Sequence, residues 1–402
     1  MPSLARFRPV ILHLLDNDLY KFTMLQALLH MFPGNTATYR FVCRNKPLIP
    51  LGSLVDEINT QLDHLCTLRF TPDELAYLSK RPYLKSDLLE FLRIFQLNRA
   101  SIRAWAEGDE LHIEAQGAQV HVMLFEIYVL AIVNEVYFRA LGGQHLDEGH
   151  CRLTAKIEQV REGLGRIGRK ATPFEFFDFG LRRRYSSEWQ REVVGTLKRE
   201  LPEHFRGTSN VLLAKELGLT PIGTMAHEYL QTFQAVGVQL QRFQHAALEG
   251  WVQEFRGDLG IALTDVVGMD AFVKDFDLYF AKLFDGLRND SGDPFEWGDK
   301  ALQSYSRLRI NALTKRLVWS NDLTIPRALE LYERFGDRVQ CGFGIGTNLS
   351  NDLGPKPLSI VMKLVRCNDL PVAKLPDSPG KTLCDDPHFL KYLAHVFERP
   401  LA

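Results

Sequence analysis

Residues 174–179 read FEFFDF, and short apolar runs of this kind recur through the second half of the chain. Each run ends in a polar or glycine-containing turn, and a helical pattern usually follows. Repeated strand–helix units place parallel strands in one sheet with helices outside it. The sequence therefore predicts an α/β fold, either a barrel or a doubly wound sheet. The further runs are TPIGTM (220–225), GIALT (260–264), DGLR (285–288), RLVWS (316–320) and VQCGFG (339–344).

Polar residues stand directly after these predicted strands. In a βα barrel they would share the rim at the carboxyl ends of the strands, where such enzymes build their sites. Asp and Gly are common in any turn, and a lone histidine often caps a helix, so each residue alone has a structural explanation. Their coincidence at one rim favours an anionic, metal-bound, phosphorylated ligand. The residues that follow the runs are Gly180, Arg182, His227, Glu228, Asp265, Asp290 to Asp293, Asn321, Asp322, Gly344, Gly346 and Thr347, and Gly207 to Asn210 stand before another predicted helix.

The first part of the chain has a mixed α+β pattern. We expect strands at 37–43, 101–106 and 110–115, helices at 53–66 and 72–95, and a very apolar helix at 122–141. Near the C-terminus, residues 357–377 predict a β-hairpin that turns at Asn368-Asp369.

Composition places the chain among soluble globular proteins. It has 402 residues, is 46% hydrophobic and 24% charged, and its net charge of −1 gives no footprint for general nucleic-acid binding. The helix at 122–141 contains Glu126 and Asn134, which favours a buried core helix over a membrane span. The six cysteines include no C-x-x-C pair, so a zinc site is not indicated and a cytoplasmic protein is expected.

Three local patterns carry little weight. Residues 163–168 match G-x-G-x-x-G, but they follow a polar helical stretch and no strand. Residues 178–180 match a kinase tripeptide without the accompanying catalytic loop. A G-x-x-x-x-G-K-[ST] sequence does not occur, so ATP would have to bind through another architecture.

Six motifs stand in order along the chain: DNDLYK (16–21), FDFGLRR (177–183), GTSN (207–210), AHE (226–228), RNDSGDP (288–294) and FGIGT (343–347). Together they resemble the bacterial nicotinate phosphoribosyltransferases, of the type II phosphoribosyltransferase family. The resemblance implies an N-terminal α+β domain (1–140), an irregular TIM-like α/β barrel (141–355) and a C-terminal segment (356–402) that packs back on the N-terminal domain.

The family's reaction joins nicotinate to 5-phosphoribosyl 1-pyrophosphate. It consumes ATP, releases nicotinate mononucleotide, pyrophosphate, ADP and phosphate, and begins the salvage of nicotinate into NAD. The resemblance also implies Mg²⁺ as cofactor and His227 as a phosphohistidine.

The pyridine ring needs aromatic faces, and the resemblance suggests Phe179 and Tyr20, with Tyr20 coming from a second subunit of a homodimer with shared active sites. Arg288 and Ser209 suit the nicotinate carboxylate, since guanidinium–carboxylate pairing is charge-assisted. Thr208, from the same motif, is also expected at the substrate.

Phosphate groups need N–H donors and cations. Backbone N–H groups of Gly344, Gly346 and Thr347 would form a nest for the 5-phosphate. Arg182 would face the pyrophosphate. These groups would stabilise the departing pyrophosphate as the sugar becomes oxocarbenium-like.

The aspartates are expected to hold Mg²⁺ or ribose hydroxyls, with Asp265 and Asp290 as the candidates. One nitrogen of His227 must act as nucleophile while an acceptor holds the other. Asp265 or Glu228 could be that acceptor. The sequence leaves open whether Asp265 or Asp270 lies beside His227.

Three alternatives compete with this interpretation. A nicotinamide phosphoribosyltransferase would carry an acid where Ser209 stands, because a carboxylate accepts from the amide but repels nicotinate. A quinolinate-type enzyme would need more basic residues and no phosphorylatable His227. A non-catalytic phosphosugar-binding barrel would leave His227 and Asp290 without a purpose.

Overall fold

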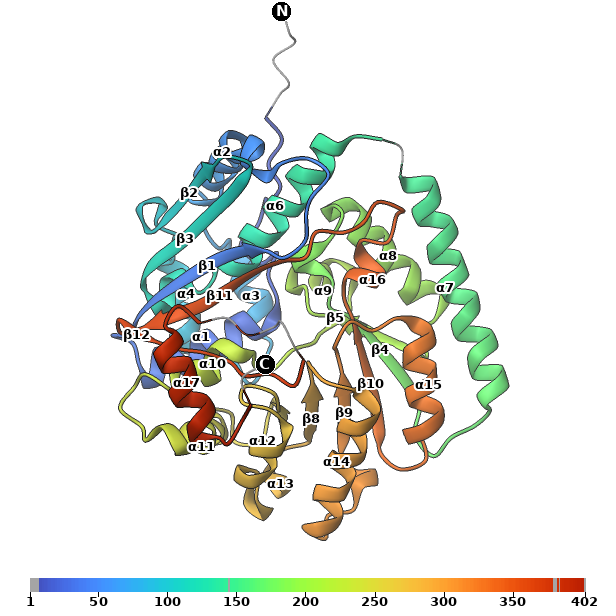
Figure 1. Cartoon of the computed structure of the whole chain (residues 1–402). Coiled ribbons are helices and arrows are strands. Elements are labelled where there is room, and N and C mark those ends of the chain that lie inside the picture. Colours follow the sequence, from blue (N-terminus) through green and yellow to red (C-terminus); the bar gives the residue numbers. More distant parts are fainter. Residues whose placement is uncertain (1–6, 144, 379–381, 383, 401–402) are drawn as a thin grey trace, which may run out of the picture.

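The computed structural model describes residues 7–143, 145–378, 382 and 384–400. It contains two sheets, a parallel one with helices outside it and an antiparallel one built from both ends of the chain (Figure 1). The predicted α/β fold with an N-terminal α+β part is confirmed. The domain bounds at 140 and 355 stay a prediction.

The parallel sheet has the order β6-β5-β4-β10-β9-β8-β7. Every apolar run named above supplies one of its strands, and the GTSN motif ends a further one. The segment that follows the edge strand β6 reaches the other edge strand, β7, since Thr224 Oγ1 donates to the carbonyl of Ile261 at 2.8 Å. The sheet is therefore an irregular, open barrel. Its strands are β4 (Phe174–Asp178), β5 (Phe205–Thr208), β6 (Thr220–Pro221), β7 (Ile261–Leu263), β8 (Gly286–Asn289), β9 (Arg316–Trp319) and β10 (Gln340–Ile345).

Strand β6 is much shorter than the run at 220–225 predicts. Pro221 has no N–H to donate to a neighbouring strand, which ends regular pairing there. The freed segment leads to α10 (His227–Thr232). The other helices that follow the strands are α8 (Ser187–Glu200), α9 (Val211–Leu217), α11 (Phe243–Phe255), α12 (Met269–Asp275), α13 (Leu278–Leu283), α14 (Pro294–Arg307), α15 (Ile325–Phe335) and α16 (Thr347–Ser350).

The G-x-G-x-x-G pattern lies at the end of a helix, α7 (Leu146–Ile167), which packs beside α15 on the outside of the barrel (Figure 1). A Cβ on Gly163 would meet Leu329 of α15 at 2.4 Å, so this glycine permits close helix packing. Gly168 ends the helix with a φ of 75°, which favours glycine. The pattern is structural, in line with its sequence context.

The antiparallel sheet has the order β12-β11-β1-β3-β2. Its C-terminal strand β11 pairs with β1 from Ala37 opposite Cys367 to Cys43 opposite Ile360. The predicted hairpin is confirmed, with positive φ at both Asn368 and Asp369. The strands are β1 (Thr36–Cys43), β2 (Ile102–Glu107), β3 (Glu110–Ala118), β11 (Ile360–Cys367) and β12 (Leu370–Pro371).

The helix predicted at 72–95 is wrong in one respect, because the structure has two helices there. Pro82 interrupts the pattern, since proline lacks an N–H and disfavours α conformation in the residue before it. A capping box between Thr71 and Glu74 starts the first of the two. The helices of this part are α1 (Leu19–Met31), α2 (Val55–Leu65), α3 (Pro72–Leu78) and α4 (Ser86–Ile94), and α17 (Pro387–Val396) follows the C-terminal hairpin.

The very apolar stretch forms α5 (Gln119–Val122) and α6 (Phe125–Leu141). It is long and apolar enough to cross a membrane, but 94% of its most apolar window is buried inside the protein, so it is a core helix. Two polar residues of α6 bind other segments of the chain. Asn134 donates to the carbonyl of Arg184 at 2.6 Å, and Glu126 binds Lys21 at 2.7 Å. The contact with Arg184 joins α6 to the barrel half of the molecule, and the contact with Lys21 joins it to α1 of its own half.

Candidate active site

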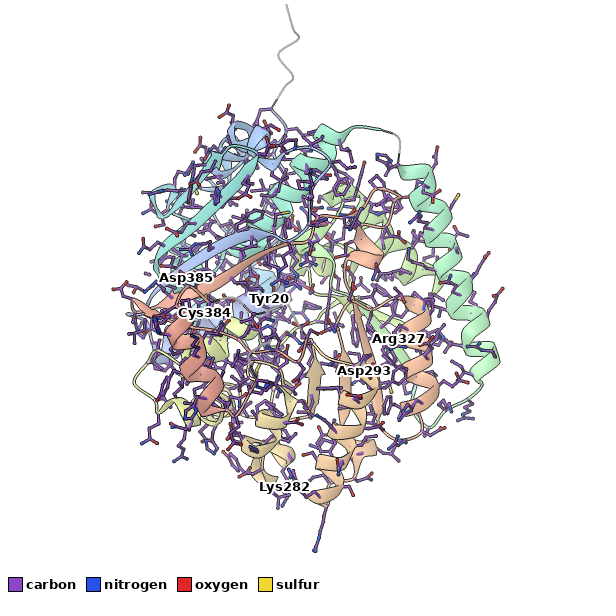
Figure 2. All side chains as sticks on the ribbon, in the orientation of Figure 1. Tyr20, Lys282, Asp293, Arg327, Cys384 and Asp385 are labelled. Atoms are coloured by element: carbon purple, nitrogen blue, oxygen red, sulfur yellow. The ribbon has the colours of Figure 1, made fainter. Side chains whose placement is uncertain are left out.

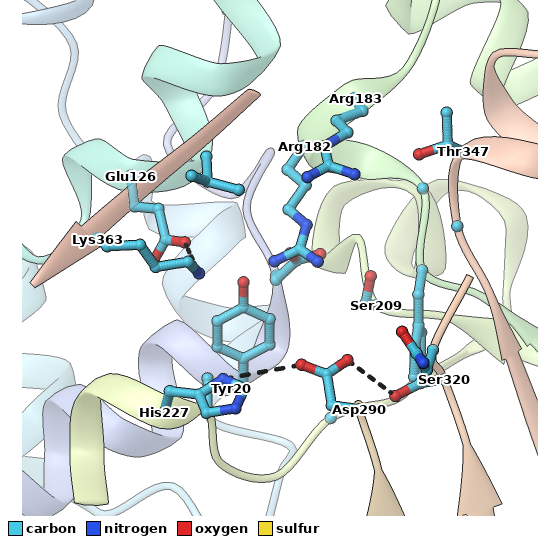
Figure 3. Close-up of a pocket in the computed structure, with 18 of the residues that line it drawn as sticks. Tyr20, Glu126, Arg182, Arg183, Ser209, His227, Asp290, Ser320, Thr347 and Lys363 are labelled. Carbon is cyan, nitrogen blue, oxygen red and sulfur yellow. Dashed lines mark hydrogen bonds and ion pairs between the residues drawn. The ribbon is translucent and has the colours of Figure 1, made fainter. Parts of the chain in front are cut away.

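A cavity of about 330 Å³ lies where the carboxyl ends of the barrel strands face the antiparallel sheet (Figure 3). Tyr20, at the start of α1, lies in the middle of the molecule between these two halves (Figure 2). Most of the residues singled out in the sequence line this cavity: Tyr20, Phe179, Arg182, Ser209, His227, Arg288, Asp290, Gly346 and Thr347.

His227 is the first residue of α10 and is buried. Its Nε2 lies 2.9 Å from Asp265 Oδ1. Its Nδ1 lies 3.7 Å from Asp290 Oδ2, and Figure 3 shows this second contact. Burial and the nearby Lys374 ammonium lower the pKa of His227, although both aspartates oppose that shift. The imidazole is therefore neutral at neutral pH, which is the form that can act as a nucleophile.

Asp265, not Asp270, is the residue beside His227. Asp270 is exposed in α12 and binds Lys300 at 2.7 Å. Burial alone would raise the pKa of Asp265, but His227 and Lys374 outweigh it and hold that pKa well below its usual range. Asp265 is thus an ionised carboxylate that supports the imidazole from behind the cavity wall.

His227, Asp265 and Asp290 each place a ligand atom within 4.8 Å of the others. Asp265 Oδ2 is buried without a hydrogen-bond partner among the described residues, so it has an oxygen to offer. Carboxylate oxygens are the ligands that Mg²⁺ prefers. The donor set therefore fits a magnesium ion held by Asp265 and Asp290.

The arginine run divides between two tasks. Arg182 and Arg183 line the cavity, whereas Arg184 is buried in a bidentate pair with Asp16, with both N–O distances 2.8 Å. Burial and the neighbouring Arg182 and Arg44 lower the pKa of Arg183 to about 10. Crowded, partly desolvated cations of this kind are typical of an anion site.

Sequence reasoning missed three cations of this cavity, Arg44, Lys363 and Lys374. Arg44 follows β1, Lys363 lies in β11, and Lys374 follows β12. The expectation that site residues follow the carboxyl ends of parallel strands does not apply to the antiparallel sheet, which supplies these three cations. The one sequence signal for Lys363 is that it is a lone cation within the apolar run 360–365, and this does not show what the residue faces.

Phe179 follows β4 and stacks on Phe177, with ring centroids 6.0 Å apart and an interplanar angle of 22°. Behind the ring, a Cβ on Gly344 would meet Phe179 at 2.3 Å. Gly344 therefore lies inside β10 as a support for the ring and does not line the cavity. Gly346 and Thr347, beyond the end of β10, do line it.

Thr208 and Ser209 of the GTSN motif have different positions relative to the cavity. Thr208 is buried and donates to Asp178 Oδ2 at 2.7 Å, so it lies behind the cavity wall. Ser209 lines the cavity, and its Oγ has no hydrogen-bond partner in the described part of the chain. Of these two residues, only Ser209 faces a ligand.

Two family models cover nearly the whole of this architecture. The nicotinate phosphoribosyltransferase (NAPRTase) family matches residues 174–401, and the N-terminal domain of the same family matches residues 15–134. The chain belongs to the nicotinate phosphoribosyltransferase family. It is accordingly an enzyme of NAD salvage, and the resemblance seen in its motifs is confirmed.

Curated relatives support the same assignment over the full length. The nicotinate phosphoribosyltransferase of Herminiimonas arsenicoxydans is 60% identical to the chain, and the match covers 98% of this chain and 99% of the relative. The nicotinate phosphoribosyltransferase of Acinetobacter baumannii is 56% identical, and the match covers 97% of this chain and 98% of the relative. A crystal structure of nicotinate phosphoribosyltransferase from Vibrio cholerae has a TM-score of 0.93 and 39% identity, with 98% of this chain and 95% of that one covered. A crystal structure of nicotinate phosphoribosyltransferase from Porphyromonas gingivalis has a TM-score of 0.89 and 33% identity. The match covers 97% of this chain and 100% of that one.

Tyr20 of this nicotinate phosphoribosyltransferase lines the cavity of its own chain (Figure 3). The expectation that Tyr20 comes from a second subunit is therefore not needed to complete the aromatic pair.

Proposed function

We propose that the enzyme forms nicotinate mononucleotide from nicotinate and 5-phosphoribosyl 1-pyrophosphate in the cytoplasm and that it couples this transfer to ATP through a phosphohistidine at His227. The observation that carries the proposal is the buried His227–Asp265 pair at 2.9 Å, placed at the wall of a cavity lined by arginines and lysines. An anion-binding cavity with an activated imidazole suits phosphoryl transfer from a polyphosphate.

Nicotinate would bind with its ring between Phe179 and Tyr20. Aromatic stacking contributes roughly 0.5–1.5 kcal/mol beyond burial. Its carboxylate would meet Arg288 and Ser209, and Arg288 Nε is buried without a partner among the described residues. This orientation directs the ring nitrogen toward the sugar.

The phosphosugar would occupy the cationic side of the cavity. Backbone N–H groups of Gly346 and Thr347 would hold the 5-phosphate, and Arg182 would face the pyrophosphate. Asp265 and Asp290 would hold Mg²⁺, which supplies positive charge to the departing pyrophosphate. Loss of such a stabilising group typically costs roughly 10²–10³ in rate.

His227 would accept the γ-phosphoryl group of ATP on Nδ1. The bond from Nδ1 to phosphorus forms, the bond from phosphorus to the β–γ bridging oxygen breaks, and ADP leaves. Asp265 holds the proton on Nε2 and stabilises the cation that develops on the ring. Water then cleaves the phosphohistidine to neutral imidazole and phosphate, and this hydrolysis makes the overall synthesis more favourable.

The substrates of this proposal are nicotinate, 5-phosphoribosyl 1-pyrophosphate and ATP. A homodimer is compatible with it, but the shared site implied by the resemblance is not required. The nicotinamide reaction and a non-catalytic barrel are less well supported, since Ser209 faces the cavity where an acid would be expected and His227 and Asp290 have a defined place in the chemistry.

The decisive assay follows nicotinate mononucleotide formation from nicotinate, phosphoribosyl pyrophosphate and Mg²⁺, with and without ATP. We expect faster and more complete synthesis with ATP, and an acid-labile, base-stable label on the protein from γ-labelled ATP. His227→Asn should abolish the label and retain slow ATP-independent transfer. Labelling and ATP coupling in that variant would contradict the proposed mechanism.

A further inference from the structure

Asp18 lies at the edge of the proposed pyridine pocket, directly before α1. The main chain fixes it there, because Asp18 forms an isolated antiparallel bridge with Asn210 and the N–H of Leu19 donates to the carbonyl of Ser209 at 2.9 Å. The side chains of Asp18 and Ser209 both line the cavity. Two segments far apart in sequence thus present a carboxyl group and a hydroxyl side by side.

Both groups are buried and incompletely bonded. Asp18 and Ser209 are each 4% exposed. Asp18 Oδ1 and Ser209 Oγ make no hydrogen bond of good geometry among the described residues, although the Ser209 and Tyr20 hydroxyls lie near enough to Asp18 to lower its pKa. A buried polar atom without a partner is unfavourable, so each of these atoms gains from a ligand that supplies one.

The charged groups around Asp18 oppose one another. Burial raises the pKa of Asp18 to about 6, and the Asp178 carboxylate adds to that rise. The Ser209 hydroxyl, the Arg182 guanidinium and the Tyr20 hydroxyl act in the opposite direction. Asp178 is itself fixed by Thr208, Gln190 and the N–H of Gly180, so it offers Asp18 no hydrogen.

This placement conflicts with a simple electrostatic argument. Ser209 suits nicotinate because an acid there would repel the substrate carboxylate, yet Asp18 supplies an acid next to Ser209. Two carboxylates that share one desolvated site are not both ionised, and a shared proton relieves the repulsion. The carboxyl of nicotinate is an ordinary acid, so at neutral pH the proton must come from solvent.

We infer that Asp18 is a specificity-determining residue of the pyridine pocket, and that it binds nicotinate as a neutral carboxyl group whose O–H donates to the substrate carboxylate. Each nicotinate that binds is then accompanied by one proton from solvent, which forms an O–H bond on the Asp18 carboxylate, and no other covalent bond changes. The inference rests on the proposed function, since it needs nicotinate to lie with its carboxylate at Ser209.

The test measures the KM for nicotinate from pH 5.5 to 8.5 at saturating ATP and phosphoribosyl pyrophosphate. In the unmodified enzyme the KM should be flat below about pH 6 and rise by up to about tenfold per pH unit above it, because only the protonated form binds. Asp18→Asn keeps a donor of similar shape but cannot titrate, so its KM should vary by less than about twofold over this range. Asp270→Asn, an exposed aspartate outside the cavity, is the matched control and should follow the unmodified enzyme.

Calorimetry gives a second readout that does not depend on turnover. Nicotinate binding at pH 7.5, measured in two buffers with different ionisation enthalpies, should show uptake of about one proton per site. A flat KM and no proton uptake in the unmodified enzyme would overturn the role of Asp18 while leaving the proposed function intact. Failure to convert nicotinate at every pH would overturn the proposed function and this inference with it. If Asp18→Asn does not fold, the profile and proton uptake of the unmodified enzyme still decide the matter.

Discussion

Asp265 Oδ1 lies 2.9 Å from His227 Nε2, and this contact leaves Nδ1 as the nitrogen without a short hydrogen bond. The relationship assigns different tasks to the two ring nitrogens. Nε2 keeps its proton and donates a hydrogen bond to a buried carboxylate, while Nδ1 stays available to a phosphoryl group. The arrangement follows the general pattern in which a third group orients a base or nucleophile.

Asp265→Asn should therefore slow phosphorylation of His227 by about 10²–10⁴. The amide has the same shape but lacks the charge that stabilises the ring cation, and it can favour the wrong tautomer. The measurement is the rate at which γ-labelled ATP labels the protein. Asp270→Asn should label at the unmodified rate, and equal rates in the two variants would remove Asp265 from the mechanism.

Lys363 should make the binding of phosphoribosyl pyrophosphate depend on pH in the alkaline range. Burial, followed by the charges of Arg182 and Lys374, lowers the pKa of Lys363 to about 8, although Glu126 opposes the shift. Below that pH the lysine is a cation, and above it the cavity loses one positive charge. The KM for phosphoribosyl pyrophosphate should consequently rise as pH increases through about 8.

Lys363→Arg supplies the check, because arginine stays charged at all relevant pH values. In this variant the KM for phosphoribosyl pyrophosphate should not rise between pH 7.5 and 9. Lys300→Arg is the control, since Lys300 is an exposed lysine paired with Asp270. A KM profile that is identical in the unmodified enzyme and in Lys363→Arg would show that Lys363 does not contact the substrate.

Tyr20 tests whether active sites are shared. Because Tyr20 and His227 line the same cavity of one chain, Tyr20→Ala and His227→Ala chains should not rescue each other when mixed. Tyr20→Ala alone should raise the KM for nicotinate by about 3- to 10-fold, the equivalent of one lost stacking contact. Activity of the mixture above the sum of the separate variants would show that Tyr20 acts across a subunit interface.

The barrel half of the site was predictable because each residue is tied to a local signal. His227 and Asp290 stand next to the ends of apolar runs, which parallel strands bring together, and Ser209 stands just before a predicted helix. These sequence signals identify a motif at the rim but not which of its residues faces the cavity. Thr208 and Gly344 lie in the right motifs but face Asp178 and Phe179 and not the cavity.

The remaining part of the site depends on packing between distant segments. Lys363 reaches the cavity only because β11 pairs with β1, a register of residues more than 300 positions apart. The choice between Asp265 and Asp270 depends on where a loop turns into α12. Asp18 required a main-chain bridge to Asn210, which no periodicity in the sequence indicates.

Gly344 separates a structural from a ligand-binding role within the FGIGT motif. A methyl group on Gly344 would overlap the Phe179 ring, since a Cβ there would lie 2.3 Å from it. Gly344→Ala should therefore displace the ring into the cavity and raise the KM for nicotinate about tenfold or more, with little change in the KM for phosphoribosyl pyrophosphate. Gly165→Ala is the control, because a Cβ at Gly165 in α7 meets nothing within 4 Å.

The two kinetic constants distinguish the explanations. If Gly344 supplied an N–H to the 5-phosphate nest, the substitution would disturb phosphate binding and the KM for phosphoribosyl pyrophosphate would rise instead. Thermal unfolding of both variants shows whether the effect is local, and Gly165→Ala should be as stable as the unmodified enzyme or slightly more so, since alanine favours a helix by about 1 kcal/mol over glycine. A Gly344→Ala enzyme with normal affinity for nicotinate would mean that Phe179 is not a wall of the pyridine pocket, because a ring that supports the substrate cannot move without cost to its binding.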